Sequence, residues 1–314
     1  MDTNKEIRRI QKIFKRPSFI NKYLNIKEIE RLKHISYYCG MDYASNHFYD
    51  FKYYVSRYDH SLNTALVTYQ LTHDKEKTLA ALLHDIASPC FSHVIDYMNE
   101  DYVTQESTEE MTRDIIRECD ELIASFKLDN ISVDKIFEYL ENSIVNNKRP
   151  KLCADRIDGI IIPGLTWLQI INADEAIKLY KSIDTCINED GEEEICINNE
   201  ASIKSLIAIN DAVNSETQKD YDIYLMNLLA MIVKTLLEDE VIKYNDLYIL
   251  KEYELIMKIE QHCRKKPDFN ALWHEFRYTN SINNPYHIEV KQRSINPLLK
   301  LDFKEIKRYN KLGD

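Results

Sequence analysis

Apolar residues recur along most of the chain with the spacing of amphipathic helices. Residues 62–69 follow an i, i+3, i+4, i+7 pattern, and residues 79–86 repeat it. The same periodicity predicts further helices at about residues 5–14, 27–38, 107–126, 133–145, 148–161, 173–183, 201–213, 221–238 and 250–263. The pattern therefore predicts a mostly helical protein.

Two short segments differ from this pattern. EEICI (193–197) follows a turn-like NEDG and indicates a short strand, and YHIEVKQ (286–292) is a candidate for another. The expected fold class is all-α with one or two short β-hairpin elements. No repeat or low-complexity linker divides the chain. We expect an N-terminal helical extension, one main helical domain and a C-terminal extension, at residues 1–26, 27–260 and 261–314.

Composition supports a helical globular protein. Apolar residues make up 44% of the 314 positions and charged residues 30%, whereas only 5 are glycine, which leaves little room for glycine-rich phosphate loops. The net charge is −11, with basic ends at residues 1–33 and 291–314. The acidic middle argues against a broad nucleic-acid surface there. The basic ends are candidates for binding a nucleotide, nucleic acid or a neighbouring subunit, or are simply solvated.

Cysteine usage and hydropathy indicate the compartment. The seven cysteines are scattered, odd in number and without CxxC pairing, as expected for reduced thiols in a cytoplasm. The N-terminus lacks the apolar core of a signal peptide. GIIIPGLTWLQII (159–171) is too short to span a membrane, and Pro163 and Gly164 interrupt it. We expect a soluble cytoplasmic protein without a membrane partner.

A candidate metal site follows from the two helices predicted by the apolar patterns at residues 62–69 and 79–86. Only about four residues (HDKE) separate them, so they should form an antiparallel hairpin that returns His84 and Asp85 to the level of His60. Two imidazoles and a carboxylate suit a divalent transition metal that needs a fourth ligand. Asp155 is the candidate, and Asp158, one turn later, is either the ligand or the partner of one. From the residues alone, an ordinary buried His–Asp pair is equally acceptable.

Longer motifs show a family resemblance. The segments are ERLKHI (30–35), SRYDHSL (56–62), LLHDIASPCFSHVID (82–96), NKRPKLCADRID (147–158) and LLEDEVIKYNDLYILKEYELIMKI (236–259). Together they resemble the HD-domain metal-dependent phosphohydrolases, and within that superfamily the deoxynucleoside triphosphate triphosphohydrolase (dGTPase-like) branch. The likeness covers roughly residues 27–260, and it is more specific for the fold and metal core than for the substrate.

The resemblance implies a set of metal ligands. His60, His84, Asp85 and Asp155 would bind a divalent ion (Mn, Fe, Co, Ni, Zn or Mg), and Asp85 would bridge two ions if two bind. Such an ion polarises a phosphoryl oxygen and lowers the pKa of a bound water.

The resemblance also implies catalytic residues. Arg57 would hold a phosphate and stabilise developing charge. His93 and Asp96 would form a nucleophile-positioning or proton-transfer pair beside the scissile phosphate. For His93 and Asp96, a capping ion pair is the alternative. Arg156 would contact a substrate phosphate.

Several positions depart from the branch. Ser88 stands where its members have a second histidine, and Gln105, before a glutamate, stands where they have a further catalytic histidine. Tyr37 falls near the glutamine that binds sugar and base, and Gly159 replaces a tyrosine that packs on the sugar. After the strand at 193–197, two lysines and an asparagine replace arginines that bind the polyphosphate. The candidate substrate-binding residues are Arg57, Arg156, Tyr37 and Gln105. Each lost cation removes about 1.5–3 kcal/mol, so triphosphate recognition should be weakened.

The expected function is metal-dependent hydrolysis of a nucleotide or related phosphate ester, with a divergent dNTP triphosphohydrolase as its narrower form. One alternative is a phosphodiesterase acting on a cyclic nucleotide or on nucleic-acid ends. The other is a weakly active or inactive nucleotide-binding regulatory subunit, which Ser88 and Gln105 would favour. The branch commonly forms homo-oligomers, so the resemblance implies one here.

Overall fold

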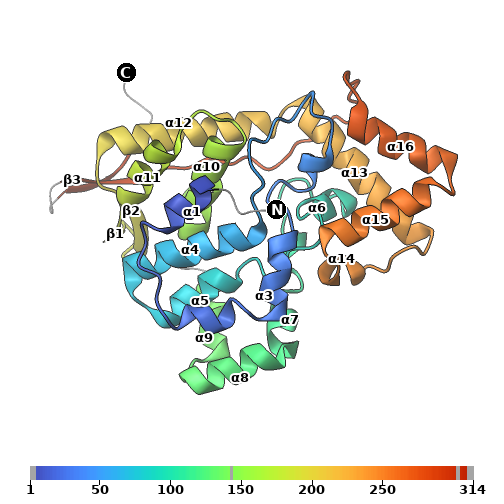
Figure 1. Ribbon diagram of the computed structural model, residues 1–314. Helices are drawn as coiled ribbons and strands as arrows, with labels where there is room; N and C mark the ends of the chain where they lie inside the picture. The colour runs from blue at the N-terminus through green and yellow to red at the C-terminus, as the bar shows by residue number, and fades with distance from the viewer. Residues whose placement is uncertain (1–4, 142–143, 302–304, 310–314) are drawn as a thin grey trace.

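Helices make up most of the computed structural model, which describes residues 5–141, 144–301 and 305–309 (Figure 1). The first helices are α1 (Lys5–Gln11), α2 (Ile20–Tyr23), α3 (Lys27–Arg31), α4 (Arg57–Thr72), α5 (Lys75–Leu83), α6 (Val94–Met98), α7 (Thr112–Glu118), α8 (Asp120–Asp129) and α9 (Val133–Glu141). The later helices are α10 (Ala154–Thr166), α11 (Ala173–Lys181), α12 (Glu200–Glu216), α13 (Asp220–Glu238), α14 (Asp246–Ile249), α15 (Glu252–Cys263) and α16 (Pro267–Tyr278). Short 3-10 helices lie at Leu32–His34, Met41–Tyr43 and Ser107–Glu109.

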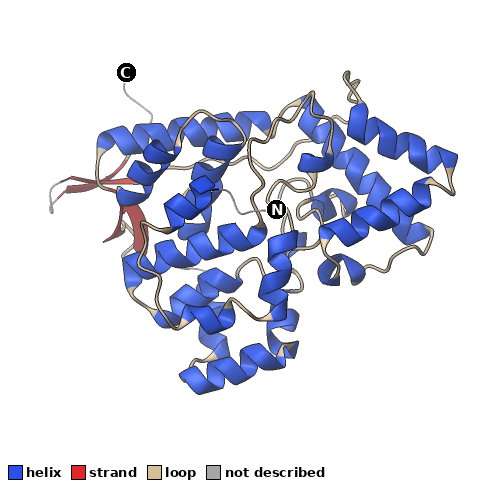
Figure 2. Cartoon of the chain, viewed as in Figure 1, coloured by secondary structure: helices blue, strands red, loops and turns tan. Residues whose placement is uncertain are grey.

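A small sheet lies at one edge of the molecule (Figure 2). Its strands, in the order of the sheet, are β1 (Ile183–Ile187), β2 (Glu193–Ile197), β3 (Leu298–Leu301) and β4 (Glu305–Arg308). The outer pairs are antiparallel hairpins, and β2 pairs in parallel with β3. The C-terminal hairpin is thereby joined to the body of the protein. The mostly helical fold with short hairpins is confirmed.

The α4–α5 hairpin is confirmed, and local capping sets its geometry. Ser56 and Asp59 form a capping box: the Asp59 N–H donates to the Ser56 hydroxyl (3.2 Å), and the Ser56 N–H donates to the Asp59 carboxylate (3.1 Å). Helix α4 ends at Thr72, and the capping residue His73 has a left-handed φ of 52°. The Asp74 carboxylate then accepts from the Lys77 N–H and starts α5. A two-residue turn therefore reverses the chain.

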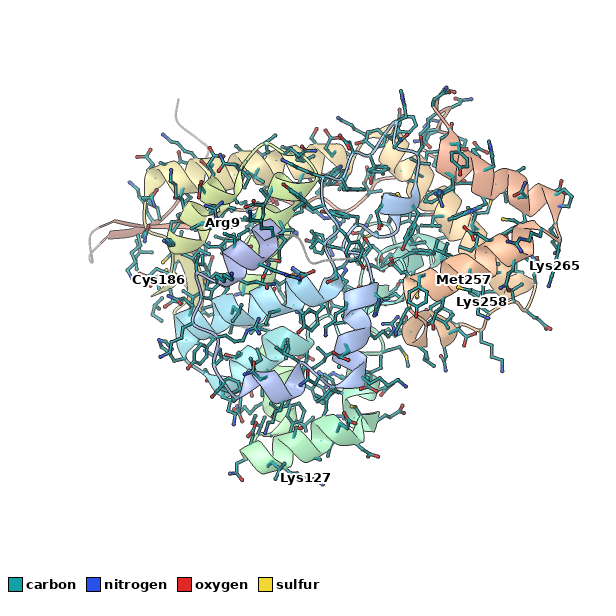
Figure 3. The ribbon with its side chains drawn as sticks, viewed as in Figure 1. Arg9, Lys127, Cys186, Met257, Lys258 and Lys265 are labelled. Carbon is teal, nitrogen blue, oxygen red and sulfur yellow. The ribbon has the colours of Figure 1, made fainter. Side chains whose placement is uncertain are left out.

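Two apolar clusters form the core. One draws on α1, α4, α5, α10, α11 and α12, and the other on α6, α13, α15 and α16. Phe51, Tyr58 and Trp167 pack against both clusters and make the interior continuous. Helix α10 lies close to α12 at Gly164, where a Cβ atom would be 2.6 Å from Ile209. At the surface, Arg9 of α1 contacts Asp174 of α11 and fastens the N-terminal helix to this body (Figure 3).

Several predicted element bounds are wrong. The segment 107–126 is divided into a 3-10 turn, α7 and α8, because Cys119 between the two helices is extended. The segment 27–38 is helical only to residue 34, and the segment 173–183 ends as a helix at Lys181 before β1 begins. Helix α10 begins at Ala154 rather than residue 148, since a residue before proline, here Arg149, disfavours helical backbone.

The C-terminal predictions also need correction. Residues 286–292 form no strand; their backbone groups bond instead to loops and side chains, as when the Lys291 N–H donates to the Tyr102 carbonyl (2.9 Å). Helix α16 was not expected. In the segment 133–145, α9 ends at Glu141, and residues 142–143 lie outside the described residues. Among the described helices, none is long and apolar enough to cross a bilayer.

Candidate metal centre and active site

Three helices bring candidate metal ligands together. His60 lies in the first turn of α4, His84 directly follows α5, and Asp155 lies in the first turn of α10. One donor atom from each lies within 4.8 Å of the other two. The His60 Nε2 atom is 3.0 Å from Asp155 Oδ1 and 3.2 Å from His84 Nε2. The distance from His84 Nε2 to Asp155 Oδ1 is 3.6 Å. The hairpin argument from sequence is therefore correct in bringing His60 to His84.

The other nitrogen of each ring fixes where the lone pairs point. His84 Nδ1 lies 2.7 Å from the carbonyl oxygen of Ala81, which can only accept, so Nδ1 carries a proton. His60 Nδ1 lies 2.6 Å from the fully buried carboxylate of Asp158 and donates to it. Both Nε2 lone pairs then face one another beside the Asp155 oxygen. Either a proton or a metal cation has to lie among these atoms.

The distances suit a divalent transition metal. Ligands about 2.1 Å from a tetrahedral metal are about 3.4 Å from one another, and the three separations of 3.0, 3.2 and 3.6 Å surround that value. Two nitrogen donors and one oxygen donor favour transition metals over calcium or magnesium. The residues present fit such an ion.

Asp85 lies next to this group, with its Oδ2 atom 3.9 Å from His60 Nε2 and 3.8 Å from His84 Nε2. The Arg57 guanidinium donates to the same oxygen (3.0 Å), to the Ser92 hydroxyl (3.0 Å) and to the Cys39 sulfur (3.7 Å). Arg57 thus holds Asp85 at the edge of the donor cluster. Its predicted contact with a phosphate stays a prediction.

Burial and charge act in opposite directions on these groups. Burial lowers the pKa of His60, but the hydrogen bonds to Asp155 and Asp158 outweigh it and raise the pKa to about 10. For His84, burial likewise lowers the pKa, and the neighbouring Asp85 and Asp155 raise it overall. Burial raises the pKa of Asp85, but Arg57 and the two histidines lower it by more, so the net pKa is below its usual value. The Asp85 carboxylate is therefore ionised at neutral pH, beside two histidines whose pKa values are raised.

His93 and Asp96 form the expected i, i+3 pair. His93 Nδ1 lies 2.8 Å from Asp96 Oδ2, and the other Asp96 oxygen accepts from the Ser107 N–H (2.9 Å). Burial lowers the pKa of His93, and Asp96 offsets this only in part. A neutral ring that donates from Nδ1 leaves the Nε2 lone pair free. The turn before α6 is sharply bent, because Phe91 and Ser92 both have positive φ.

One cavity of about 890 Å³ connects these groups. Its lining includes Tyr37, Arg57, His60, His84, Asp85, His93, Gln105, Asp155 and Arg156. Asp96 and Asp158 are fully buried behind it. The ring of Tyr37 lies 5.1 Å from that of His60 and 5.1 Å from the Arg57 guanidinium. The structure thus brings every sequence-predicted site residue to one place.

Two of the predicted substrate contacts are already occupied by protein groups. Arg156 donates to the backbone carbonyls of Asn147 (2.7 Å) and Lys151, and so closes the loop before α10. Gln105, which has a left-handed φ of 51°, accepts a hydrogen bond from Arg293 (2.8 Å). Their roles toward a substrate stay predictions.

Sequence reasoning missed several residues of the cavity. Lys148, Arg149, Lys291 and Arg293 line it and supply positive charge that the comparison with the dGTPase-like branch did not predict. Arg149 lies inside the NKRPK segment of one of the family motifs. The excess of basic residues from 291 onward was also a signal, but a solvent-exposed basic end explains it equally well. Tyr180 was also missed: its hydroxyl donates to Asp158, the partner of His60.

Comparison with known proteins agrees with this geometry. Residues 57–161 match the family model of the HD domain, which takes in the α4–α5 hairpin, the His93 turn and the start of α10. This segment is an HD domain. Domains of this kind are typically metal-dependent phosphohydrolases that bind divalent ions.

Relatives extend the likeness beyond this segment. Over 130 residues, the chain is 28% identical to the uncharacterized protein YdhJ of Bacillus subtilis (strain 168), a match that covers 41% of the chain and 38% of YdhJ. The chain therefore matches well under half of that relative's length. A crystal structure of a hypothetical protein from Aquifex aeolicus aligns over 83% of this chain and 71% of its own, with a TM-score of 0.57 and 15% identity. The latter shows a shared fold.

Proposed function

We propose that this protein is a divalent-metal-dependent phosphohydrolase acting on a nucleotide or a related phosphate compound. The observation that carries the proposal is the convergence of two imidazole lone pairs and a carboxylate oxygen inside an HD domain. The large cavity in front of this cluster supports a phosphate compound of nucleotide size as the substrate.

Named residues take distinct roles in this proposal. His60, His84 and Asp155, with Asp85 beside them, would hold the ion, and a bound divalent ion supplies Lewis acidity to a phosphoryl oxygen. Arg57 orients Asp85 and keeps it ionised through their 3.0 Å contact. His93, whose Nδ1 is held by Asp96, takes or gives a proton at Nε2.

A deoxynucleoside triphosphate is the narrower substrate that the sequence resemblance favours. Its support comes from the motifs around His60, His84 and His93. A homo-oligomer likewise stays a prediction from the resemblance. The alternative of an inactive nucleotide-binding subunit is kept as an outcome of the experiment below.

The test combines metal analysis with a substrate panel. Purified protein should contain Mn, Fe, Co, Ni or Zn near one or two equivalents, and Asp155→Ala should lose it, whereas the exposed control Asp134→Ala should retain it. Wild-type protein should hydrolyse at least one member of a panel of dNTPs, NTPs, monophosphates, cyclic nucleotides and single-stranded DNA with Mn²⁺ or Mg²⁺. The product, whether triphosphate, pyrophosphate or monophosphate, identifies the bond that is cut.

Two outcomes would contradict the proposal. Unchanged metal content in Asp155→Ala would contradict the assignment of the metal centre, and with it the proposed metal-dependent hydrolysis. Metal near stoichiometry without turnover of any panel member would favour the regulatory alternative over the enzyme.

A further inference from the structure

The connection between α5 and α6, residues 84–93, has an unusual backbone at its centre. Phe91 and Ser92 have φ values of 62° and 45°, so two consecutive residues with side chains lie in the left-handed region. Residues other than glycine rarely adopt this conformation, and it persists only where the surrounding structure holds it. The two residues directly precede His93, so their backbone sets the direction in which the His93 ring points.

Helices α14 and α15 hold this connection from outside the HD segment (Figure 1). The Cys90 N–H donates to the Leu247 carbonyl of α14 (2.8 Å). The Phe91 N–H donates to Oε1 of Glu252, in the first turn of α15 (3.1 Å). The first residue of the left-handed pair is thereby bonded to a side chain 161 positions later in the chain.

A second buried charged residue joins the same elements. Arg31, the last residue of α3, is buried. Its guanidinium donates to the Ser88 carbonyl (2.8 Å) on one side and to the carbonyls of Leu247 and Leu250 (2.8 and 2.9 Å) on the other. Arg31 therefore ties the connection between α5 and α6 to the segment that joins α14 to α15.

The left-handed turn is closely packed and leads directly to site residues. The Phe91 ring is fully buried, and a Cβ atom at Gly40 would lie 2.6 Å from it. The Ser92 hydroxyl accepts from the Arg57 guanidinium (3.0 Å), and His93 follows with its side chain in the cavity lining. A shift of this turn would therefore displace the partner of Arg57 and the His93 ring together.

We propose that Glu252 and Arg31 are positioning residues of the reaction: they hold the left-handed turn and so fix the place of the His93 ring relative to the metal ligands. Neither of them lines the cavity, so each acts through the turn. This inference rests on the proposed function, in which His93 takes or gives a proton. It extends the set of residues that serve the reaction to α3 and α15, outside residues 57–161.

Histidine NMR in the presence of zinc tests the positioning role without depending on turnover. Nitrogen-15 shifts show which ring nitrogen carries the proton, and the spectrum of His93→Gln identifies the His93 signals. In the wild type, His93 should carry its proton on Nδ1, as its 2.8 Å contact with Asp96 requires. Glu252→Met removes the acceptor of the Phe91 N–H at similar side-chain size, so His93 should show both tautomers. His262, on the same helix, should be unchanged.

Glu252→Gln is the conservative variant, because it restores an accepting oxygen. Burial raises the pKa of Glu252 to about 8, so the wild-type side chain and its glutamine replacement are both uncharged at pH 7. Glu252→Met should make the Phe91 amide exchange its hydrogen about tenfold faster or more, and Glu252→Gln should recover both the slow exchange and the single His93 tautomer. Glu260→Met, at an exposed position of α15, should match the wild type.

Hydrolysis of the panel compounds with Mn²⁺ gives the kinetic counterpart. Glu252→Met should lower kcat about tenfold or more and change KM less than about twofold, because a misplaced proton-transfer group affects the chemical step. In a His93→Ala background the same substitution should have no further effect, since its effect passes through that ring. Arg31→Gln tests the turn from α3, and it decides the matter if Glu252→Met does not fold.

The outcomes keep this inference apart from the proposed function. A single Nδ1–H tautomer of His93 in both Glu252→Met and Arg31→Gln would overturn the positioning role, even in an active enzyme. Rapid exchange of the wild-type Phe91 amide would overturn it without any variant. If no panel compound is hydrolysed, the proposed function fails, and the NMR measurements still decide whether Glu252 and Arg31 hold the turn.

Discussion

His60 is hydrogen-bonded at both ring nitrogens, and its two partners act differently. Asp158 accepts from Nδ1 (2.6 Å), whereas Asp155 lies 3.0 Å from Nε2, on the side where His84 also points. The sequence left these two aspartates as alternatives because they lie one turn apart on the same helix. The choice depends on which ring nitrogen each one reaches, and side-chain orientation of this kind is not encoded in residue spacing.

Metal binding should release protons from this cluster. Since burial is outweighed by the bonds to Asp155 and Asp158 and the pKa of His60 is raised to about 10, the metal-free ring is protonated at neutral pH. A metal ion takes Nε2 only without its proton, so affinity should rise with pH from about 6 to 9, up to about tenfold per unit for each proton displaced. Titration calorimetry in two buffers of different ionisation enthalpy should give at least one proton released per ion. A count of zero would contradict the assignment.

Asp158→Asn tests the carboxylate behind His60. Loss of its negative charge lowers the pKa of His60 and the donor strength of Nε2, so fewer protons should be released and metal affinity should fall about 10–100-fold. Tyr180→Phe is the matched control, because it removes only the hydroxyl that donates to the other Asp158 oxygen. Chelator competition measures both affinities. Equal affinity in wild type and Asp158→Asn would show that Asp158 serves packing alone.

At the scale of elements, apolar periodicity predicted the elements that pack against the core through a regular apolar face of their own. The α4–α5 hairpin, β2 and helices α12, α13 and α15 follow the pattern closely. Periodicity failed where one local feature decides the backbone. Arg149–Pro150 delays the start of α10, and extended Cys119 separates α7 from α8 although buried apolar residues continue on both sides. Residues 286–292 have a strand-like sequence, but side chains and loops satisfy their backbone groups.

Helix α15 begins with a buried carboxyl group that should make stability depend on pH. Glu252 accepts from the Phe91 N–H (3.1 Å), while burial, together with the charge of nearby Asp42, raises its pKa to about 8. The unfolded value is about 4.3, so the folded state binds this proton more tightly. The stabilisation of the fold by protonated Glu252 is therefore full at low pH, falls as the pH rises toward 8 and levels off above that value.

Glu252→Gln should remove this dependence. Between pH 6 and pH 9, the free energy of unfolding of the wild type should fall by about 3 kcal/mol more than that of Glu252→Gln. Urea denaturation at the two pH values measures the difference, and the exposed Glu260→Gln on the same helix should behave as wild type. Parallel pH profiles for wild type and Glu252→Gln would refute a protonated Glu252 in the folded state.

At the scale of the whole molecule, the cavity draws on segments that are far apart in sequence. The HD core at residues 57–161 carries recognisable motifs, so its histidines and aspartates could be predicted. Lys291 and Arg293 come from the extended segment before β3, more than a hundred residues beyond Asp158. Their position depends on how α16 and the C-terminal hairpin pack against the body, through Phe276 and the β2–β3 pairing. No local pattern carries that information.

Metal removal should destabilise the entire fold, because the proposed ligands join α4, the end of α5 and α10. An ion present at about 100 times its dissociation constant adds about 2.7 kcal/mol to stability, which for a chain of this length corresponds to about 4 °C in Tm. Differential scanning calorimetry of metal-loaded and chelator-treated protein should show this shift for the wild type and for Lys291→Gln. Asp155→Ala should show none, since its donor cluster is incomplete. Identical Tm values for loaded and stripped wild type would mean that the three helices are held by packing alone and that the donor cluster is not a metal centre.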